Sequence, residues 1–339
     1  MGVVFVLTYT YAQTTVIGSA ADEVSAGTRA DVAVTAGALG GVPADVLPAV
    51  QGTAGVRAAA PVTGTSVVWP HRELGSETME LEPALVLTPA AAGVLDLDVR
   101  AGRLADLTGP TVAVGNDVAK ARSVELGSSV RLRLGDGAAV RARVVAVYDR
   151  SLGFGPLVVS ADLAGGHVAP LADQLLVRTD GSARARQAVA AVAAGRPGLD
   201  VGPADARADG AGGPAPEVWV NLAAVSVLLG YLLLGIANQL VAATLARRGE
   251  LATLRLTGST PRQVRAMVRR EALLMTAASV AAGLALAVVP LALLGIGFVD
   301  RPWPVGPFWL VPVTVLAVAA VAFLTTELPT RRMLRASLP

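Results

Sequence analysis

The sequence predicts an integral membrane protein in which an α-helical transmembrane bundle carries an extracytoplasmic α+β domain. Three observations predict this class. The chain of 339 residues is 53% hydrophobic and only 16% charged, which is far from the composition of soluble proteins. Its longest uncharged runs lie after Glu217. The part before Glu217 has mixed charge and alternates short strand patterns with short helix patterns.

Three uncharged runs in the C-terminal third, of 29, 28 and 25 residues, are each long enough to cross a bilayer. About 20 apolar residues, each rising 1.5 Å in a helix, span a hydrocarbon core. We therefore predict transmembrane helices at about 218–246, 272–298 and 305–327. Pro290 and Pro312 lie inside two of them, where membrane helices tolerate proline.

The arginines predict the orientation of these helices. By the positive-inside rule, arginine-rich connections are cytoplasmic. The segment 247–270 and the tail 329–339 are therefore cytoplasmic, and the domain before Glu217 lies outside a plasma membrane. The arginines concerned are Arg247, Arg248, Arg255, Arg262, Arg265, Arg269 and Arg270 in the connection, and Arg331, Arg332 and Arg335 in the tail.

Residues 1–21 are uncharged and apolar, and two interpretations remain open. We favour a first transmembrane helix whose cytoplasmic lead-in is absent from this sequence. A signal peptide is the alternative, supported by the small residues Ser19 to Ala21 and weakened by the missing basic n-region. Both interpretations deliver the following domain to the outside.

The extracytoplasmic domain spans 28–215, in one or two lobes because the alternation is interrupted at 64–110. The clearest element is a β-hairpin over 131–144, where Leu132 and Leu134 alternate with arginines before Gly135-Asp136-Gly137.

Strand-then-helix patterns occur twice more in this domain. A strand at 111–114 precedes a helix at 117–126 with Asn116 as its N-cap, and a strand at 174–178 precedes a helix at 183–194. The Gly- and Pro-rich stretch 203–216 is a linker into the membrane.

Several functions are excluded by residues that the sequence lacks. It has no cysteine, and its two histidines, His71 and His167, stand in no metal-ligand spacing. We therefore expect no metal, no cofactor and no catalytic residue. The only lysine, Lys120, is not in a phosphate-binding loop, so the chain shows no ATPase motif of its own. Gly153-Phe154-Gly155 is interpreted as a loop.

The distribution of charged residues along the chain indicates which function classes and which partners are compatible with it. The three uncharged runs contain no Asp, Glu, Lys, Arg or His. Secondary transporters and channels usually carry such residues within their spans, so these two classes are disfavoured. The excess positive charge belongs to the C-terminal third, where it indicates topology and contact with membrane lipids, with no nucleic acid as partner.

The segment 238–271 predicts two helices with a break. Gly258 ends the first helix, Ser259 or Thr260 caps the second, and Pro261 occupies its first turn. Arginines and apolar residues form separate stripes on the second helix, so we expect it to lie along the membrane surface and offer one face to a partner.

This segment resembles the FtsX-like permease domain of the MacB class of ABC transporters, and 112–148 is similar to the periplasmic core domain of that class. The resemblance covers nearly the whole chain, with 218–328 as the permease domain. The residues that carry it after a membrane helix are Asn238, Arg248, Glu250, Leu254, Gly258, Ser259 and Gln263.

The resemblance implies a permease subunit that couples ATP hydrolysis by a separate cytoplasmic ABC ATPase to movement of the external domain, a mechanism called mechanotransmission. It also implies a second permease unit, as a homodimer or as the other half of a longer protein. The ATPase contact would involve Arg247, Arg248, Glu250, Leu251, Leu254, Arg255, Gly258, Pro261, Gln263 and Val264.

Two functions fit this arrangement. One is export or extraction of a substrate, and the other is a signalling relay that activates an extracytoplasmic hydrolase without moving cargo. Because both would use the same coupling segment and external domain, the sequence leaves them, the cargo and the completeness of the chain open.

Overall fold

The computed structural model describes residues 2–204 apart from 74, 75, 169 and 170, the helix 261–299, and single positions within 223–242 and 303–320. The chain divides into two compact units. We call residues 1–18 with 212–339 the helical unit, and residues 19–211 the sheet unit. The expected tail 329–339, and the linker after Ala204, lie outside the described residues.

Helix α1 (Gly2–Gly27) extends the helix expected over 1–21 by six residues and contributes to both units. In the helical unit its Leu7 and Tyr11 are buried against Ala287 and Leu291. The edge of the Tyr11 ring also faces Trp303 at a centroid distance of 6.3 Å.

Helix α9 (Pro261–Val299) is a continuous helix of 39 residues that includes Pro290, so its axis is about 58 Å long. Within the described part of the chain, its segment Leu273–Gly297 is the one stretch long and apolar enough to cross a membrane. The expected spans at 218–246 and 305–327 are described only at single positions, most of which are helical.

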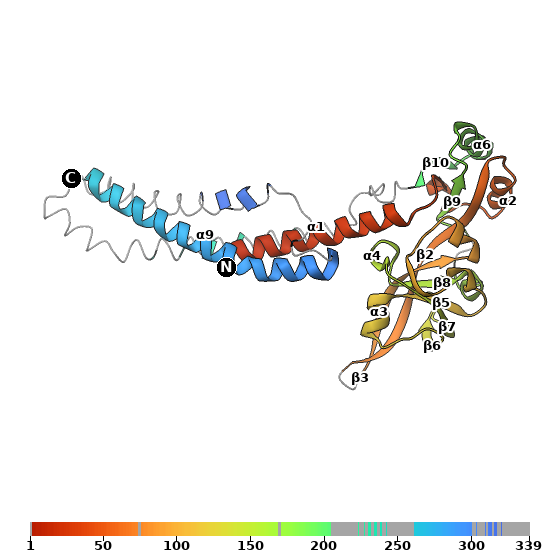
Figure 1. Cartoon of the computed structure of the whole chain (residues 1–339), viewed down its shortest axis with the longest axis horizontal. Coiled ribbons are helices and arrows are strands. Elements are labelled where there is room, and N and C mark those ends of the chain that lie inside the picture. Colours follow the sequence, from red (N-terminus) through yellow and green to blue (C-terminus); the bar gives the residue numbers. More distant parts are fainter. Residues whose placement is uncertain are drawn as a thin grey trace. The chain divides into compact units, whose positions relative to one another are not determined.

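The sheet unit is built on one ten-stranded mixed sheet in the order β10-β1-β9-β2-β3-β8-β5-β7-β4, with β6 paired to β2 and β7 (Figure 1). This confirms the α+β class for the domain. The strands are β1 (Val32–Thr35), β2 (Val56–Glu73), β3 (Ser76–Leu87), β4 (Val99–Gly102), β5 (Thr111–Gly115), β6 (Ser129–Arg133), β7 (Ala139–Tyr148), β8 (Leu157–Ser160), β9 (Gln174–Thr179) and β10 (Asp200–Pro203).

Short helices cover the sheet, and three apolar clusters form its core. One cluster joins α2 and α6 to strands β1 and β9 through residues such as Val50, Leu175 and Val189. The helices are α2 (Val46–Gln51), α3 (Asn116–Ala121), α4 (Ser151–Phe154), α5 (Ala161–Ala164) and α6 (Ala183–Ala194), with 3-10 turns at Gly37–Leu39, Pro89–Gly93 and Leu104–Asp106.

The expected hairpin over 131–144 is present as β6 and β7. Leu134 donates its N–H to Ala138 O at 3.0 Å across the turn, and Gly137 has a φ of 87° that suits glycine. Leu132 and Ala142 are buried while the arginines between them are exposed, as the alternation predicts.

The helix expected over 117–126 with Asn116 as N-cap differs from the observed one. Helix α3 runs from Asn116 to Ala121, and Gly115 is its N-cap. Ser123 has a φ of 51°, which ends the helical path. Val124 then donates to Ala119 O at 2.8 Å, and its side chain packs against the apolar core.

The region 64–110, where the alternation is interrupted, holds most of a long antiparallel arm. Strands β2 and β3 pair from Val62 with Leu87 to Glu73 with Ser76. Pro70 and Pro83 lie within this arm, where their fixed φ and missing N–H weaken a strand pattern. The arm extends from the sheet in Figure 1.

Candidate functional site

The segment predicted to contact an ATPase reaches the described structure only at its end. Pro261 occupies the first position of α9, where its missing N–H costs no hydrogen bond. Gln263 is exposed in the first turn. Val264 lies in the same turn, and nothing is described of its side chain. The other predicted residues lie outside the described residues, namely Arg247, Arg248, Glu250, Leu251, Leu254, Arg255 and Gly258.

No helix end separates the residues after Pro261 from the apolar segment Leu273–Gly297 of α9. The sequence analysis expected a separate helix along the membrane surface. The stretch from Arg262 to Pro290 instead holds a single glycine and no proline before its end, and it is rich in Ala, Leu and Arg, which favour helix. The first turn of α9 is therefore continuous with the apolar segment in one helix.

A second arrangement joins the end of α1 to α4 within the sheet unit, and we call it the α1 joint. The Gly153 N–H donates to Glu23 Oε2 at 2.9 Å. A Cβ atom on Gly153 would lie 2.9 Å from Ala20 O and from Val24 N. Since both of these are backbone atoms of α1, only glycine permits the contact.

The last residue of α1 is held by backbone contacts as well. Asp96 donates its N–H to Gly27 O at 2.7 Å, and Arg29 donates to Val94 O at 2.9 Å. A Cβ atom on Gly27 would overlap the Phe154 ring and lie 2.7 Å from Asp96 O. The end of α1 is thus enclosed by α4 on one side and by residues 94–96 on the other.

Charged side chains also connect the residues around the end of α1. Arg29 Nη2 lies 2.7 Å from Asp96 Oδ2, and Arg150 Nη1 donates to Asp96 O at 2.6 Å. Burial opposes ionisation of Asp96, but a hydrogen bond from Asp98 N–H and the Arg29 guanidinium keep its pKa below the usual value.

The pKa of Glu23 is shifted in the opposite direction from that of Asp96. Burial raises its pKa, and the nearby charge of Asp117 acts in the same direction. Hydrogen bonds from the Gly153 and Leu152 N–H groups and the charge of Arg150 oppose this rise without cancelling it. Ionisation of the Glu23 carboxyl group is therefore less favourable in the α1 joint than in water.

The α1 joint was not predicted from the sequence. Gly153-Phe154-Gly155 was interpreted as a loop, whereas Ser151–Phe154 is one turn of helix. Glu23 and Gly153 are 130 positions apart, so no local pattern connects them. The apolar residues Leu152 and Phe154 on either side of Gly153 were the only available signal.

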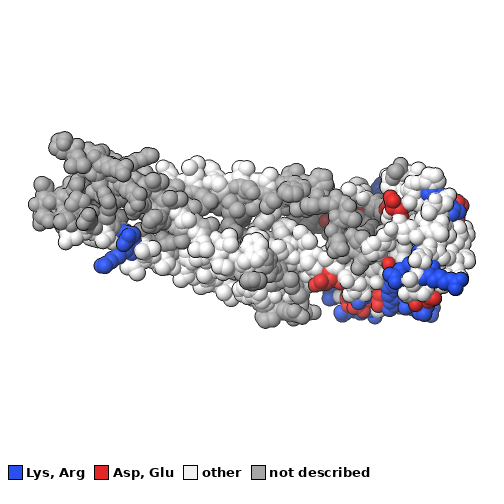
Figure 2. All heavy atoms as spheres, turned by 90° about the horizontal axis from the view of Figure 1, so that it is seen from above, with Lys and Arg blue, Asp and Glu red and all other residues white. Residues whose placement is uncertain are grey.

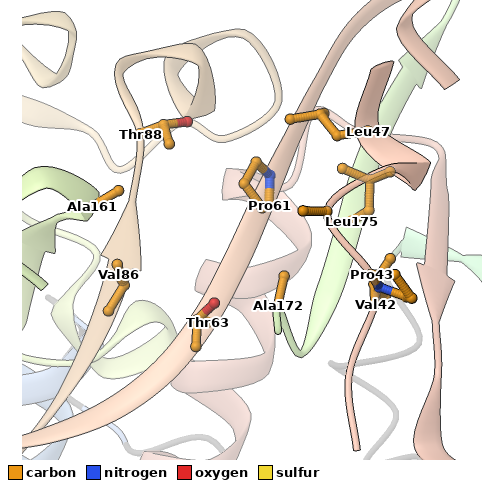
Figure 3. Close-up of a pocket in the computed structure, with 11 residues that line it drawn as sticks. Val42, Pro43, Leu47, Pro61, Thr63, Val86, Thr88, Ala161, Ala172 and Leu175 are labelled. Atoms are coloured by element: carbon orange, nitrogen blue, oxygen red, sulfur yellow. The ribbon is translucent and has the colours of Figure 1, made fainter. Parts of the chain in front are cut away.

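The described residues of the rest of the sheet unit were compared with what a ligand site or a metal site requires. A pocket of about 180 Å³ is lined mainly by apolar residues, with the Thr63 and Thr88 hydroxyls as its polar groups (Figure 3), and it is smaller than typical ligand sites. His167 Nδ1 lies 2.7 Å from Asp136 Oδ2 in exposed turns, and the His71 side chain lies outside the described residues. Among described residues, no cluster of His, Asp or Glu could hold a metal ion.

Comparison with known proteins identifies the C-terminal part. Residues 222–338 match the family of FtsX-like permease C-terminal domains. Among curated proteins, none matches the sequence.

Solved structures of two extracytoplasmic regions are similar to part of the chain. The periplasmic region of MacB from Actinobacillus actinomycetemcomitans is 12% identical with a TM-score of 0.42, over 57% of this chain and 97% of that one. The extracellular domain of the noncanonic ABC-type transporter YknZ from Gram-positive bacteria is 15% identical with a TM-score of 0.37, over 48% of this chain and 89% of that one.

Proposed function

Because residues 222–338 are an FtsX-like permease domain, as the resemblance predicted, we propose that this chain is the permease subunit of a MacB-class ABC transporter that works by mechanotransmission. A separate cytoplasmic ATPase hydrolyses ATP, and the resulting motion moves the sheet unit outside the membrane to export or extract a substrate. The permease itself performs no chemistry.

The observation that carries this proposal is that α1 is one uninterrupted helix with residues in both units. Its Leu7 and Tyr11 pack against α9, the helix whose first turn holds the end of the coupling segment. Its residues 20–27 are enclosed in the α1 joint by direct backbone contacts. A helix is stiff along its axis, so α1 is suited to carry a displacement from α9 to the sheet unit.

The membrane arrangement that we propose has four spans: about 1–21 within α1, about 218–246, the apolar part of α9, and about 305–327. The C-terminus and the coupling segment are cytoplasmic, and a second permease unit completes the assembly. The chain has no cysteine, so Ser337→Cys provides a unique label. Labelling of intact spheroplasts from outside by a membrane-impermeant reagent would contradict this topology.

The coupling contact is tested by reversing charges singly. Arg248→Glu and Glu250→Arg are each expected to lower recovery of the ATPase with the detergent-solubilised permease by at least about tenfold, since reversing one charge at an interface places like charges together and costs several kcal/mol. Membrane insertion should be unchanged. Arg335→Glu, with the same charge change in the tail, is the control.

Normal ATPase recovery with both reversals would refute the coupling contact at these residues. A substrate that moves only in the presence of ATP and of an intact contact supports transport. An external hydrolase that is activated without any transported substrate would support the signalling relay in its place.

A further inference from the structure

Four arginines lie on one exposed face of the β6–β7 hairpin. Arg131 stands directly opposite Arg141, Arg133 opposite Ala139, and Arg143 opposite Ser129. All four arginines are exposed, while the residues between them are buried. Directly opposed residues of antiparallel strands point to the same face, so the four guanidinium groups form one cluster.

Within the described part of the chain these four arginines form no ion pair, and Arg133 reaches only Gly137 O, at 3.5 Å. Many other arginines of the sheet unit pair with a carboxylate, namely Arg29, Arg100, Arg103, Arg122, Arg150 and Arg196. Like charges placed opposite each other destabilise a sheet.

General basicity does not explain the cluster. Residues 19–211 hold 17 Lys and Arg against 21 Asp and Glu, a net charge of 17 minus 21, or −4. A concentrated positive face on an acidic domain breaks a local rule without compensation in the fold, which is characteristic of functional surfaces.

The same face continues into apolar side chains on the β2–β3 arm. Val68 pairs with Arg133 on one side and with Leu81 on the other, and Pro70 pairs with Met79. Leu81 is 67% exposed and Met79 is 60% exposed. We call Met79, Leu81, Arg131, Arg133, Arg141 and Arg143 the arginine face.

Two acidic residues of β3, Glu80 and Glu82, lie on the other face, whereas Glu77 stands opposite Arg72 in the alternation of Met79 and Leu81. Glu80 and Glu82 alternate with Met79 and Leu81 and lie on the opposite face of the arm, where Arg122 contacts them at 2.7 and 2.5 Å. There Arg122 also stacks over Trp69, with 4.5 Å between the guanidinium carbon and the ring centroid. Figure 2 shows the mixed positive and negative surface that the sheet unit presents on one side.

We propose that the arginine face binds the anionic phospholipid headgroups of the extracytoplasmic leaflet, with Met79 and Leu81 inserted between them. Guanidinium groups bind phosphate oxygens in pairs, and exposed apolar residues beside cations are typical of surfaces that bind lipid. Because the sheet unit is covalently attached to a membrane helix, the bilayer is present at high effective concentration.

This inference rests on the proposed membrane attachment and external location of the sheet unit and needs no ATPase. Each arginine near an anionic membrane surface raises partitioning by about fivefold, so four arginines contribute on the order of several hundredfold. Screening limits this attraction to about 10 Å at 0.1 M salt. Binding should therefore weaken as the salt concentration rises.

The experiment uses the absence of cysteine from the full chain. The full-length Met79→Cys variant carries one polarity-sensitive nitrobenzoxadiazole label and is placed in nanodiscs. One set contains phosphatidylcholine alone, and the other contains about 30 mol% phosphatidylglycerol. We expect a blue shift and a rise in emission only with phosphatidylglycerol, and loss of both at high salt.

The decisive variant is Arg131→Glu with Arg141→Glu, which reverses the charge at two directly opposed positions of the arginine face. It should abolish the phosphatidylglycerol-dependent shift, with at least about a 25-fold loss of partitioning. The control is Arg184→Glu with Arg186→Glu, the same change of charge on exposed positions of α6, and it should retain the shift.

A label that stays in water in both bilayers would overturn the proposal, and so would a shift that survives the reversal at Arg131 and Arg141. Either result would direct attention to an acidic protein as the partner of this face. Should the double reversal lose its far-ultraviolet circular dichroism, Arg131→Ser with Arg141→Ser, which removes the repulsion, provides the same comparison. Loss of ATPase binding alone leaves this proposal untouched.

Discussion

The helical unit and the sheet unit arrange their large apolar side chains in opposite ways. Helix α9 exposes Leu274, Leu286 and Leu293 and buries only a few residues, such as Leu291, against α1. The sheet unit encloses most of its large apolar residues in three clusters and has many of its arginines on the surface. In Figure 2 the described surface of the helical unit is almost free of charge.

This difference shows which medium each unit is adapted to. Exposure of large apolar residues is unfavourable in water and neutral in hydrocarbon. The sheet unit follows the rule for a water-soluble domain. The helical unit follows the rule for a membrane, which is consistent with the FtsX-like family of residues 222–338.

The largest expected effect comes from replacing an exposed leucine of α9 by arginine and comparing the result with the same change in the sheet unit. Leu286, 60% exposed near the middle of the spanning segment, is changed to arginine. If lipid surrounds it, insertion of this segment should become less favourable by about 2.5–3.5 kcal/mol. The measurement is the inserted fraction of the segment in a translocon glycosylation assay.

Leu126→Arg is the matched control, because Leu126 is an exposed apolar residue of the sheet unit. Surrounded by water, it should change unfolding free energy by no more than about 0.5 kcal/mol. Equal tolerance of arginine at both positions would contradict the comparison between the two units.

A smaller effect is expected at the α1 joint, where the two units share a helix. Gly153→Val would force α4 away from the backbone of α1 and should cost about 1–3 kcal/mol. We expect faster hydrogen exchange in peptides covering 20–27 and 150–156, measured by mass spectrometry on the purified full chain. ATP-driven function should fall while ATPase binding remains.

Gly202→Val is the control for this substitution. Nothing lies within 4 Å of a Cβ atom on Gly202, so the same change should leave exchange at the α1 joint unaltered. Unchanged exchange in Gly153→Val would mean that α4 does not hold the end of α1.

The smallest effect concerns the charge of Glu23. Burial raises its pKa, so the folded state binds a proton more readily than the unfolded state. The stabilisation from this proton is complete below the unfolded pKa and is lost as the pH rises through the folded pKa. The joint should therefore loosen slightly with rising pH over that interval, as judged by exchange of the same peptides.

Two substitutions separate charge from hydrogen bonding at this position. Glu23→Gln keeps an acceptor for the Gly153 N–H and should remove the pH dependence with little loss of stability. Glu23→Ala leaves that partly buried N–H without its acceptor and should cost about 1–3 kcal/mol. A pH dependence that persists in Glu23→Gln would assign the titration to another group.

Elements with a strong local period were predicted well. The strand and helix expected at 174–178 and 183–194 correspond to β9 and α6, and the hairpin over 131–144 corresponds to β6 and β7. In each case the apolar residues recur at the spacing of the element itself, so neighbours in the sequence contain the information.

Elements whose partners are distant were predicted poorly. The arm of β2 and β3 has prolines within its strands, and long pairing with a neighbour stabilises it despite them. Helix α3 ends earlier than expected because the chain turns at Ser123 and the Val124 side chain packs against the core. The arginine face was visible as alternating arginines, but its continuation onto Met79 and Leu81 depends on the pairing of β6 with β2.

The sequence by itself determined the division of this protein into a membrane part and an α+β part, and its FtsX-like character, because composition and local periodicity are read from neighbouring residues. Only the tertiary structure decided that Gly153 meets Glu23 and which side chains share the arginine face. These features depend on backbone contacts between distant segments and on strand register, which local patterns do not contain.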